Sequence, residues 1–144
     1  LGSGSGSSSA VVEEKSTEVT KTTNVASAQA DIKTYRCGRV VQISGYVEFK
    51  PVSGIDQKNI FVIIKPPAGK PAESVFCSAW VSTVPSHGGS PLTTKDWACF
   101  VELRPETMYG DLGTAVQVSI QNGYTFTSSE IYHVVFGCTY IAAE

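Results

Sequence analysis

The feature that most constrains the fold is the alternation of apolar and polar residues between Tyr35 and Lys50. Successive side chains of a β-strand point to opposite faces, so this pattern is typical of a strand with one buried face. A turn at Cys37-Gly38 precedes the alternation. The apolar positions are Val41, Ile43, Val47 and Phe49, and the polar positions are Gln42, Ser44, Glu48 and Lys50. The stretch contains no catalytic motif, which favours a protein that binds a ligand over one that transforms it.

From residue 31 onward, short strand-like segments alternate with segments rich in turn residues. All seven prolines lie outside the interiors of the expected strands, where a missing N–H would break a hydrogen-bond ladder. Asn122-Gly123 predicts a tight turn before a further short strand at Tyr124–Thr127. The main expected strands are Ile32–Arg36, Val40–Lys50, Ile60–Lys65, Ser74–Thr83, Trp97–Leu103, Ala115–Gln121 and Ile131–Ala142. Because helical periodicity is absent, we predict an all-β antiparallel β-sandwich or jelly roll.

The N-terminal part of the chain has a different composition. Residues 1–9 read LGSGSGSSS, which predicts a flexible Gly/Ser linker. Residues 10–30 are rich in Thr, Ser, Val and Ala, and we expect an extended stalk or a first strand there rather than a helix. We therefore divide the chain into a linker and stalk at 1–30 and a β-sandwich head domain at 31–144.

Charge and hydropathy exclude two classes of function. The net charge is −2, whereas nucleic-acid-binding proteins usually carry a basic surplus. The longest apolar run, Ile60 to Ile64, is far too short to cross a membrane. We expect neither nucleic acid nor membrane insertion.

The four cysteines, Cys37, Cys77, Cys99 and Cys138, lie within or beside apolar strand patterns. They contain no C-x-x-C pair and the chain has only two histidines, which argues against a zinc site. Free core thiols are the favoured interpretation, with at least one disulfide as the alternative. Four cysteines permit three pairings, among which the sequence does not choose.

The sequence shows no catalytic constellation. His133 lies in an apolar strand, where a hydrogen-bonded structural histidine is the usual outcome, and there is no G-x-S-x-G or phosphate-binding loop. The scattered carboxylates favour solvated charges over a hydrolytic pair, which needs two carboxylates at a set separation. They are Asp56, Asp96, Glu102, Glu106 and Asp111. We expect no enzyme activity, no cofactor and no metal.

Saccharide binding requires fewer specific residues than catalysis does, because an aromatic ring and a few fixed polar groups are sufficient. Loops on a rigid β-scaffold often carry such groups, and two loops here, at 82–97 and 104–113, contain them. The candidate saccharide-binding residues are His87, Asp96, Trp97, Arg104, Tyr109 and Asp111. Trp97 is alternatively a core residue at the start of a strand. Trp80, Phe76 and Phe100 form an expected apolar face of the kind that an oligomer covers.

Three segments in this order resemble a known pattern. The first is Cys37–Gly45, CGRVVQISG; the second is the Pro/Gly turn Lys65–Ala72 leading into Ser74–Trp80; the third is Val134–Ala142, VVFGCTYIA. Together they resemble the C-terminal head domains of bacteriophage tail-fibre and baseplate receptor-binding proteins. The central turn departs from the family pattern, with Lys65 in place of leucine and Lys70 in place of an aromatic residue.

The resemblance covers about residues 32–144. It implies a β-sandwich head that assembles as a homotrimer, binds a saccharide of the host cell surface and contacts other tail or baseplate proteins. It also implies a location in the virion, after assembly in the host cytoplasm. Two alternatives remain, a purely structural tail or baseplate module and a glycan depolymerase.

Overall fold

Every strand pairs antiparallel with its neighbours, as the alternating sequence pattern predicts. The computed structural model describes residues 10–54, 57–85, 93–94, 99–105, 114–120 and 124–144. This part of the chain is all-β and contains no helix, so it has no helix that is long and apolar enough to cross a membrane. Its strands are β1 (Val12–Ser16), β2 (Val19–Lys21), β3 (Val25–Cys37), β4 (Val40–Pro51), β5 (Asn59–Ile64), β6 (Val75–Pro85), β7 (Thr93–Thr94), β8 (Cys99–Arg104), β9 (Thr114–Ile120) and β10 (Glu130–Ile141).

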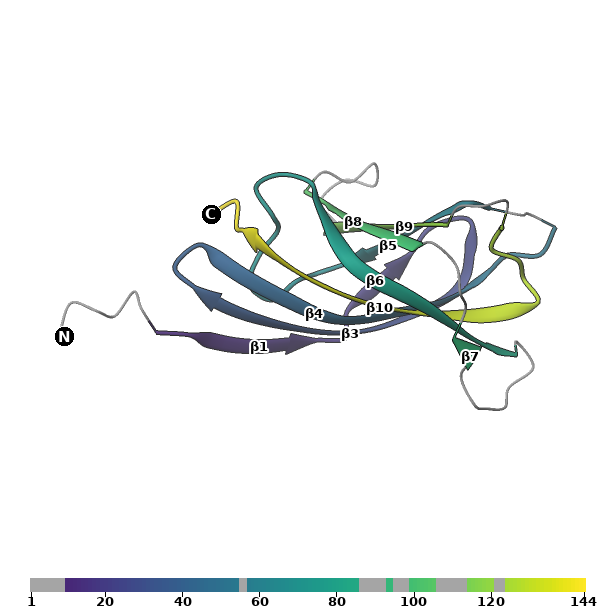
Figure 1. Ribbon diagram of the computed structural model, residues 1–144, viewed down its shortest axis with the longest axis horizontal. Coiled ribbons are helices and arrows are strands. Elements are labelled where there is room, and N and C mark those ends of the chain that lie inside the picture. The colour runs from purple at the N-terminus through teal and green to yellow at the C-terminus, as the bar shows by residue number, and fades with distance from the viewer. Residues whose placement is uncertain (1–9, 55–56, 86–92, 95–98, 106–113, 121–123) are drawn as a thin grey trace.

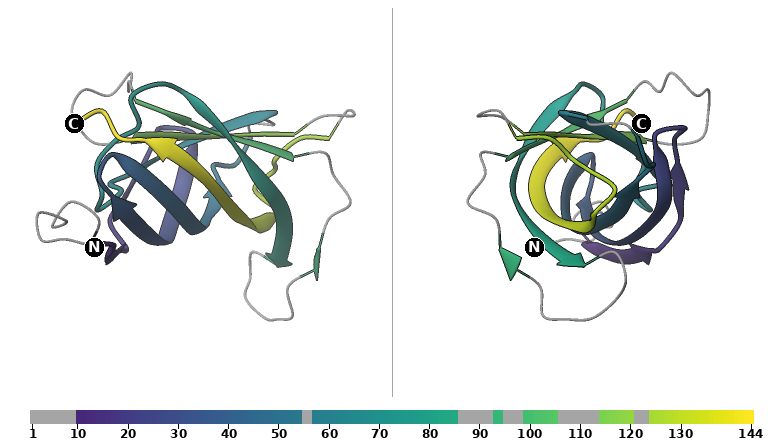
Figure 2. Two further views of the ribbon diagram at one scale, coloured as in Figure 1. Left: turned by 60° about the vertical axis from the view of Figure 1, so that its left-hand side comes forward. Right: turned by 90° about the vertical axis from the view of Figure 1, so that its right-hand side faces the viewer.

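The strands form one curled sheet in the order β1-β3-β4-β10-β6-β8-β9-β5-β2, with β7 paired to β6 (Figure 1). The two strands at the ends of this order, β1 and β2, are separated in the chain only by Thr17 and Glu18. A single N-terminal segment therefore supplies both edges of the sheet. The strands wind round a common interior as a result (Figure 2).

Strand β6 connects the two halves of the sheet. From Ser78 to Pro85 it pairs with β10, and from Val75 to Cys77 it pairs with β8. Its neighbour therefore changes between Cys77 and Ser78. One half of the sheet contains β1, β3, β4 and β10, and the other contains β8, β9, β5 and β2.

The core lies between the inner faces of the two halves. The four apolar residues expected to be buried on β4 are at most 1% exposed, which confirms the opening prediction. Residues such as Val62, Leu103 and Val116 face them from β5, β8 and β9 and are fully buried. Burial of apolar surface on this scale is the main stabilising contribution to such a fold.

Aromatic rings contribute a second part of the core. Phe126 packs edge-on against Phe49 and Tyr132, with ring centroids 5.2 and 4.8 Å apart. A backbone N–H from Thr127 donates to the Tyr132 hydroxyl at 3.0 Å, so the buried phenol oxygen is hydrogen-bonded. Phe126 also forms an isolated bridge with Gln57, which anchors its loop segment to the strand β5 region.

The seven main expected strands are present. Six have bounds within two residues of those expected, whereas β3 begins at Val25, seven residues before the expected Ile32. The prediction of a short strand at Tyr124–Thr127 was wrong, because only an isolated bridge at Phe126 forms there. Asn122 and Gly123 lie outside the described residues. The Pro/Gly turn is present and is closed by a hydrogen bond of 3.0 Å from the Gly69 N–H to the Pro66 carbonyl.

The N-terminal segment lies in the sheet rather than apart from it. Residues expected as a stalk or first strand form β1, β2 and the first half of β3. The expected boundary at residue 31 falls inside β3, which runs unbroken from Val25 to Cys37. Residues 1–9 lie outside the described part of the chain.

Cys77, Cys99 and Cys138 are half-buried thiols that pack against the core. Cys37 is half-buried at the end of β3.

Gly45 on β4 lies directly against the backbone of β3. It has a φ of 150°, and a Cβ placed there would lie 2.1 Å from the carbonyl oxygen of Asp31. The obstructing atom belongs to the backbone of a paired strand, so it cannot rotate out of the way.

We therefore expect Gly45→Ala to lower the free energy of unfolding by about 3 kcal/mol, since the strands must separate locally. Gly54→Ala is the matched control, because a Cβ there meets nothing within 4 Å and only the φ of 81° is strained, at a cost of about 1 kcal/mol. Urea unfolding measures both values. Equal losses in the two variants would contradict the close-approach argument.

Candidate functional site

Three large aromatic side chains stand exposed on the outer face of β6 and β8. The exposed fractions are 70% for Phe76, 56% for Trp80 and 43% for Phe100. Phe76 and Trp80 alternate along β6 with inward-facing residues, and Phe100 shares its face of β8 with Glu102, which lies opposite Phe76. We call Phe76, Trp80 and Phe100 the aromatic patch. A patch of exposed apolar side chains often marks a surface that binds a ligand or a partner.

A row of polar side chains borders the aromatic patch. Ser119 lies opposite Phe100, and Gln117 lies opposite Glu102 on β9. The Ser119 hydroxyl donates to Asn59 Oδ1 at 2.5 Å, Gln117 Nε2 donates to Ser119 Oγ at 3.2 Å, and Arg104 Nη1 donates to Gln117 Oε1 at 3.5 Å. We call Asn59, Arg104, Gln117 and Ser119 the polar strip. These mutual hydrogen bonds hold its amide, hydroxyl and guanidinium groups in fixed directions.

A second polar cluster lies on the other side of Trp80. Trp80 is opposite Val135 on β10, and Val135 is opposite Tyr46 on β4. The Tyr46 and His133 rings are 4.4 Å apart, and His133 Nδ1 is 3.2 Å from Glu48 Oε1. An ionised carboxylate only accepts hydrogen bonds, so Nδ1 is the donor when the Glu48 carboxylate is ionised. This confirms the expected hydrogen-bonded histidine.

Within the part of the chain that the structure describes, the aromatic patch is an exposed surface on β6 and β8. A flat ring surface can pack against an apolar ligand face, while the polar strip supplies donors and acceptors at its edge. Arg104 and Glu102 add one positive and one negative group beside Phe76 and Phe100. The arrangement therefore fits a ligand that is amphipathic, uncharged overall and rich in hydroxyl groups.

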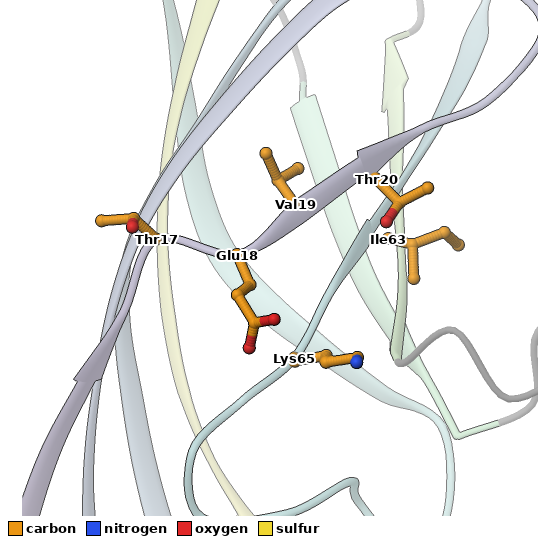
Figure 3. A pocket seen from close by; sticks show the side chains of 6 residues that line it. All are labelled: Thr17, Glu18, Val19, Thr20, Ile63 and Lys65. Carbon is orange, nitrogen blue, oxygen red and sulfur yellow. The ribbon is translucent and has the colours of Figure 1, made fainter.

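The described residues also line concave sites. A pocket of about 360 Å³ lies at the junction between β1 and β2, beside β5. Glu18 and Lys65 lie on the same side of it (Figure 3). Its other lining residues are Thr17, Val19, Thr20 and Ile63. A groove of about 460 Å³ runs between residues 72–75 and 139–141, and a smaller one of about 260 Å³ includes Arg104. The first pocket contains no aromatic side chain, and its two charges are of opposite sign, so it matches no ligand class as well as the open face does.

Of the six candidate residues expected from sequence, only Arg104 lies in the described part of the chain, and the structure places it beside the aromatic patch. The other five, His87, Asp96, Trp97, Tyr109 and Asp111, lie outside the described residues and stay predictions. Three members of the site were missed, namely Asn59, Gln117 and Ser119. Gln117 and Ser119 occupy the polar positions of the alternating segment TAVQVSI, which identifies them as outward-facing. Their neighbours on β8 and β5 become visible only with the strand register.

Among the residues that the structure describes, no cluster of His, Cys, Asp or Glu is arranged to hold a metal ion. No protein-family model, curated protein or solved structure matches the chain.

The exposure of Trp80 yields a prediction about stability. Trp80→Ala removes a ring that is more than half exposed, so the free energy of unfolding should change by less than about 1 kcal/mol. Val81→Ala at the next position truncates a fully buried side chain and should cost about 2 kcal/mol. Urea denaturation of the two variants measures the difference. A larger loss for Trp80→Ala than for Val81→Ala would show that the ring stabilises the fold.

Proposed function

We propose that the chain is a non-catalytic, saccharide-binding head of the bacteriophage tail-fibre or baseplate type. The observation that carries the proposal is the aromatic patch beside the polar strip on one open face. A pyranose ring has an apolar face of C–H groups and a rim of hydroxyls. The C–H face packs on an exposed ring such as Trp80, and the hydroxyls exchange hydrogen bonds with groups such as Gln117 and Arg104.

The shape of the site supports a surface glycan over a small free ligand. An open face buries only part of any ligand, which is expected when the ligand is one segment of a long chain. Phe76 and Trp80 are separated by Ser78 along one outer face of β6, so consecutive sugar units have more than one ring on which to pack. The mixed charge of Glu102 and Arg104 favours a neutral saccharide over a strongly anionic one.

The family resemblance in the sequence extends the proposal. We infer that the curled sheet is a sandwich or jelly-roll head, that it assembles as a homotrimer and that it attaches to other tail or baseplate proteins of the virion. In such an assembly the aromatic patch has a competing role as a subunit interface. The test below therefore includes the oligomeric state.

The test is binding of the purified protein to a panel of bacterial surface polysaccharides, with light scattering to give its mass. We expect saturable binding to at least one neutral polysaccharide. Trp80→Ala should weaken it at least tenfold, which corresponds to about 1.4 kcal/mol of binding free energy. Gln117→Ala should weaken it as well. Val12→Ala is the matched control, because it removes exposed apolar surface from β1, which lies four positions from β6 and five from β8 in the strand order.

The other outcomes identify the competing functions. Unchanged binding in Trp80→Ala would exclude the aromatic patch as the saccharide site. A trimer that binds no polysaccharide would instead support the structural module. Dissociation of the oligomer in Trp80→Ala would assign the patch to a subunit interface. Release of reducing sugar from a bound polysaccharide would contradict the non-catalytic proposal.

A further inference from the structure

Two cysteines that are distant in the sequence lie close together at the point where the pairing of β6 changes from β10 to β8. Cys77 lies on β6 and Cys138 on β10, and their sulfur atoms are 2.9 Å apart. Both side chains face inward, are half-buried and pack against the core.

The strand register explains the contact. The β6–β10 ladder runs without irregularity to the pair Ser78 and Gly137, and the next step of the same register brings Cys77 opposite Cys138. Directly opposed residues of antiparallel strands have Cα atoms roughly 4.5–5.5 Å apart, within the range that disulfides span. A bond between these cysteines therefore needs little movement of either strand.

The electrostatics of the pair favour one thiolate. The Cys77 S–H donates a hydrogen bond to the Cys138 sulfur, which lowers the pKa of Cys138. The same hydrogen bond, together with burial, raises the pKa of Cys77. The first proton therefore leaves Cys138, and the resulting thiolate is the attacking species in thiol–disulfide exchange.

We propose that Cys77 and Cys138 are a redox-active pair that forms a reversible cross-strand disulfide with a small disulfide oxidant such as oxidised glutathione. The Cys138 thiolate attacks one sulfur of the oxidant, forms a mixed disulfide and releases one glutathione thiolate. Cys77 then loses its proton to solvent and attacks the Cys138 sulfur, which expels the second glutathione thiolate. The protein loses two electrons and two protons, and one oxidised glutathione becomes two reduced molecules.

The bond has a structural consequence. It links β6 to β10 at the point where β6 leaves β10 for β8. It also connects residues that are 61 positions apart, and closing a long loop restricts the unfolded chain more than the folded one. This inference is independent of saccharide binding.

The test uses the purified protein incubated with reduced or oxidised glutathione, alkylated under denaturing conditions and digested with trypsin and an endoproteinase that cleaves after glutamate. The double digest places each cysteine in its own peptide, at residues 37–39, 74–95, 96–102 and 131–144. We expect a cross-link between peptides 74–95 and 131–144 after oxidation. We also expect the melting temperature to rise by roughly 5–15 °C and to return to its initial value with dithiothreitol.

Cys99 provides an internal comparison, because burial raises its pKa to about 11. At pH 8 its thiol is almost entirely protonated, so alkylation of the folded, reduced protein should be slow and should accelerate as the pH approaches 11. Cys138 should react at least tenfold faster than Cys99 at pH 8. Equal rates at pH 8 would contradict the assigned thiolate.

Cys77→Ser and Cys138→Ser should abolish the cross-link and the thermal shift, whereas Cys37→Ser should retain both. Cys77→Ala serves as a second variant if serine at this half-buried position impairs folding, and peptide mapping of the unchanged protein needs no variant. Thiols that stay reduced in oxidised glutathione, a cross-link between another pair of peptides, or a glutathione adduct on Cys138 that never resolves would each overturn the proposal.

Discussion

The exchange of hydrogen-bonding partner along β6 is the constraint on which the rest of the structure depends. Residues Val75–Cys77 of this strand pair with β8, and residues Ser78–Pro85 pair with β10. β6 therefore joins the two halves of the sheet. Because the halves are joined in this way, their inner faces oppose each other and bury residues such as Val81 and Leu103 together. The N-terminal segment repeats the arrangement at the other side, where β1 and β2 pair with different strands.

The same strand determines what the two faces of the sheet present. Strand geometry places Phe76 and Trp80 outside and Cys77, Ala79 and Val81 inside. The neighbouring β8 adds Phe100 to the outer side, and β9 adds the amide and hydroxyl of the polar strip. The side chains proposed for recognition and those of the core therefore occupy alternate positions of one segment. A change at one position need not alter the other, so the proposed binding face can be altered without disturbing the core.

The alternating strands were predictable because the order of apolar and polar residues within each one shows which side chains are buried. Segments such as TAVQVSI have a buried and an exposed side that period-two alternation reveals directly. β1 shows no such alternation, since four of its five residues are exposed, and it joins the sheet by pairing with β3. The expected division at residue 31 reflects this missing local signal.

The candidate site was less predictable, because its members meet through register rather than through local pattern. Arg104 was expected from loop composition, but its partner Gln117 and the nearby Asn59 depend on the order β8-β9-β5. The Glu48 partner of His133 is 85 residues away, and the Cys77–Cys138 contact spans 61 residues. Pairings at such separations are fixed by the topology of the sheet, which no single segment encodes.

The two proposals concern opposite faces of one strand, and this has an energetic consequence. Ordering of flexible groups is one of the costs that binding must overcome. A disulfide at Cys77 would restrain the backbone that carries Phe76 on one side and leads to Trp80 on the other, without touching either ring. The restraint lowers the ordering cost and leaves the contacts of the ligand unchanged. The two proposals taken together predict that oxidation raises affinity at the proposed saccharide-binding face through the rigidity of β6, mainly as slower dissociation.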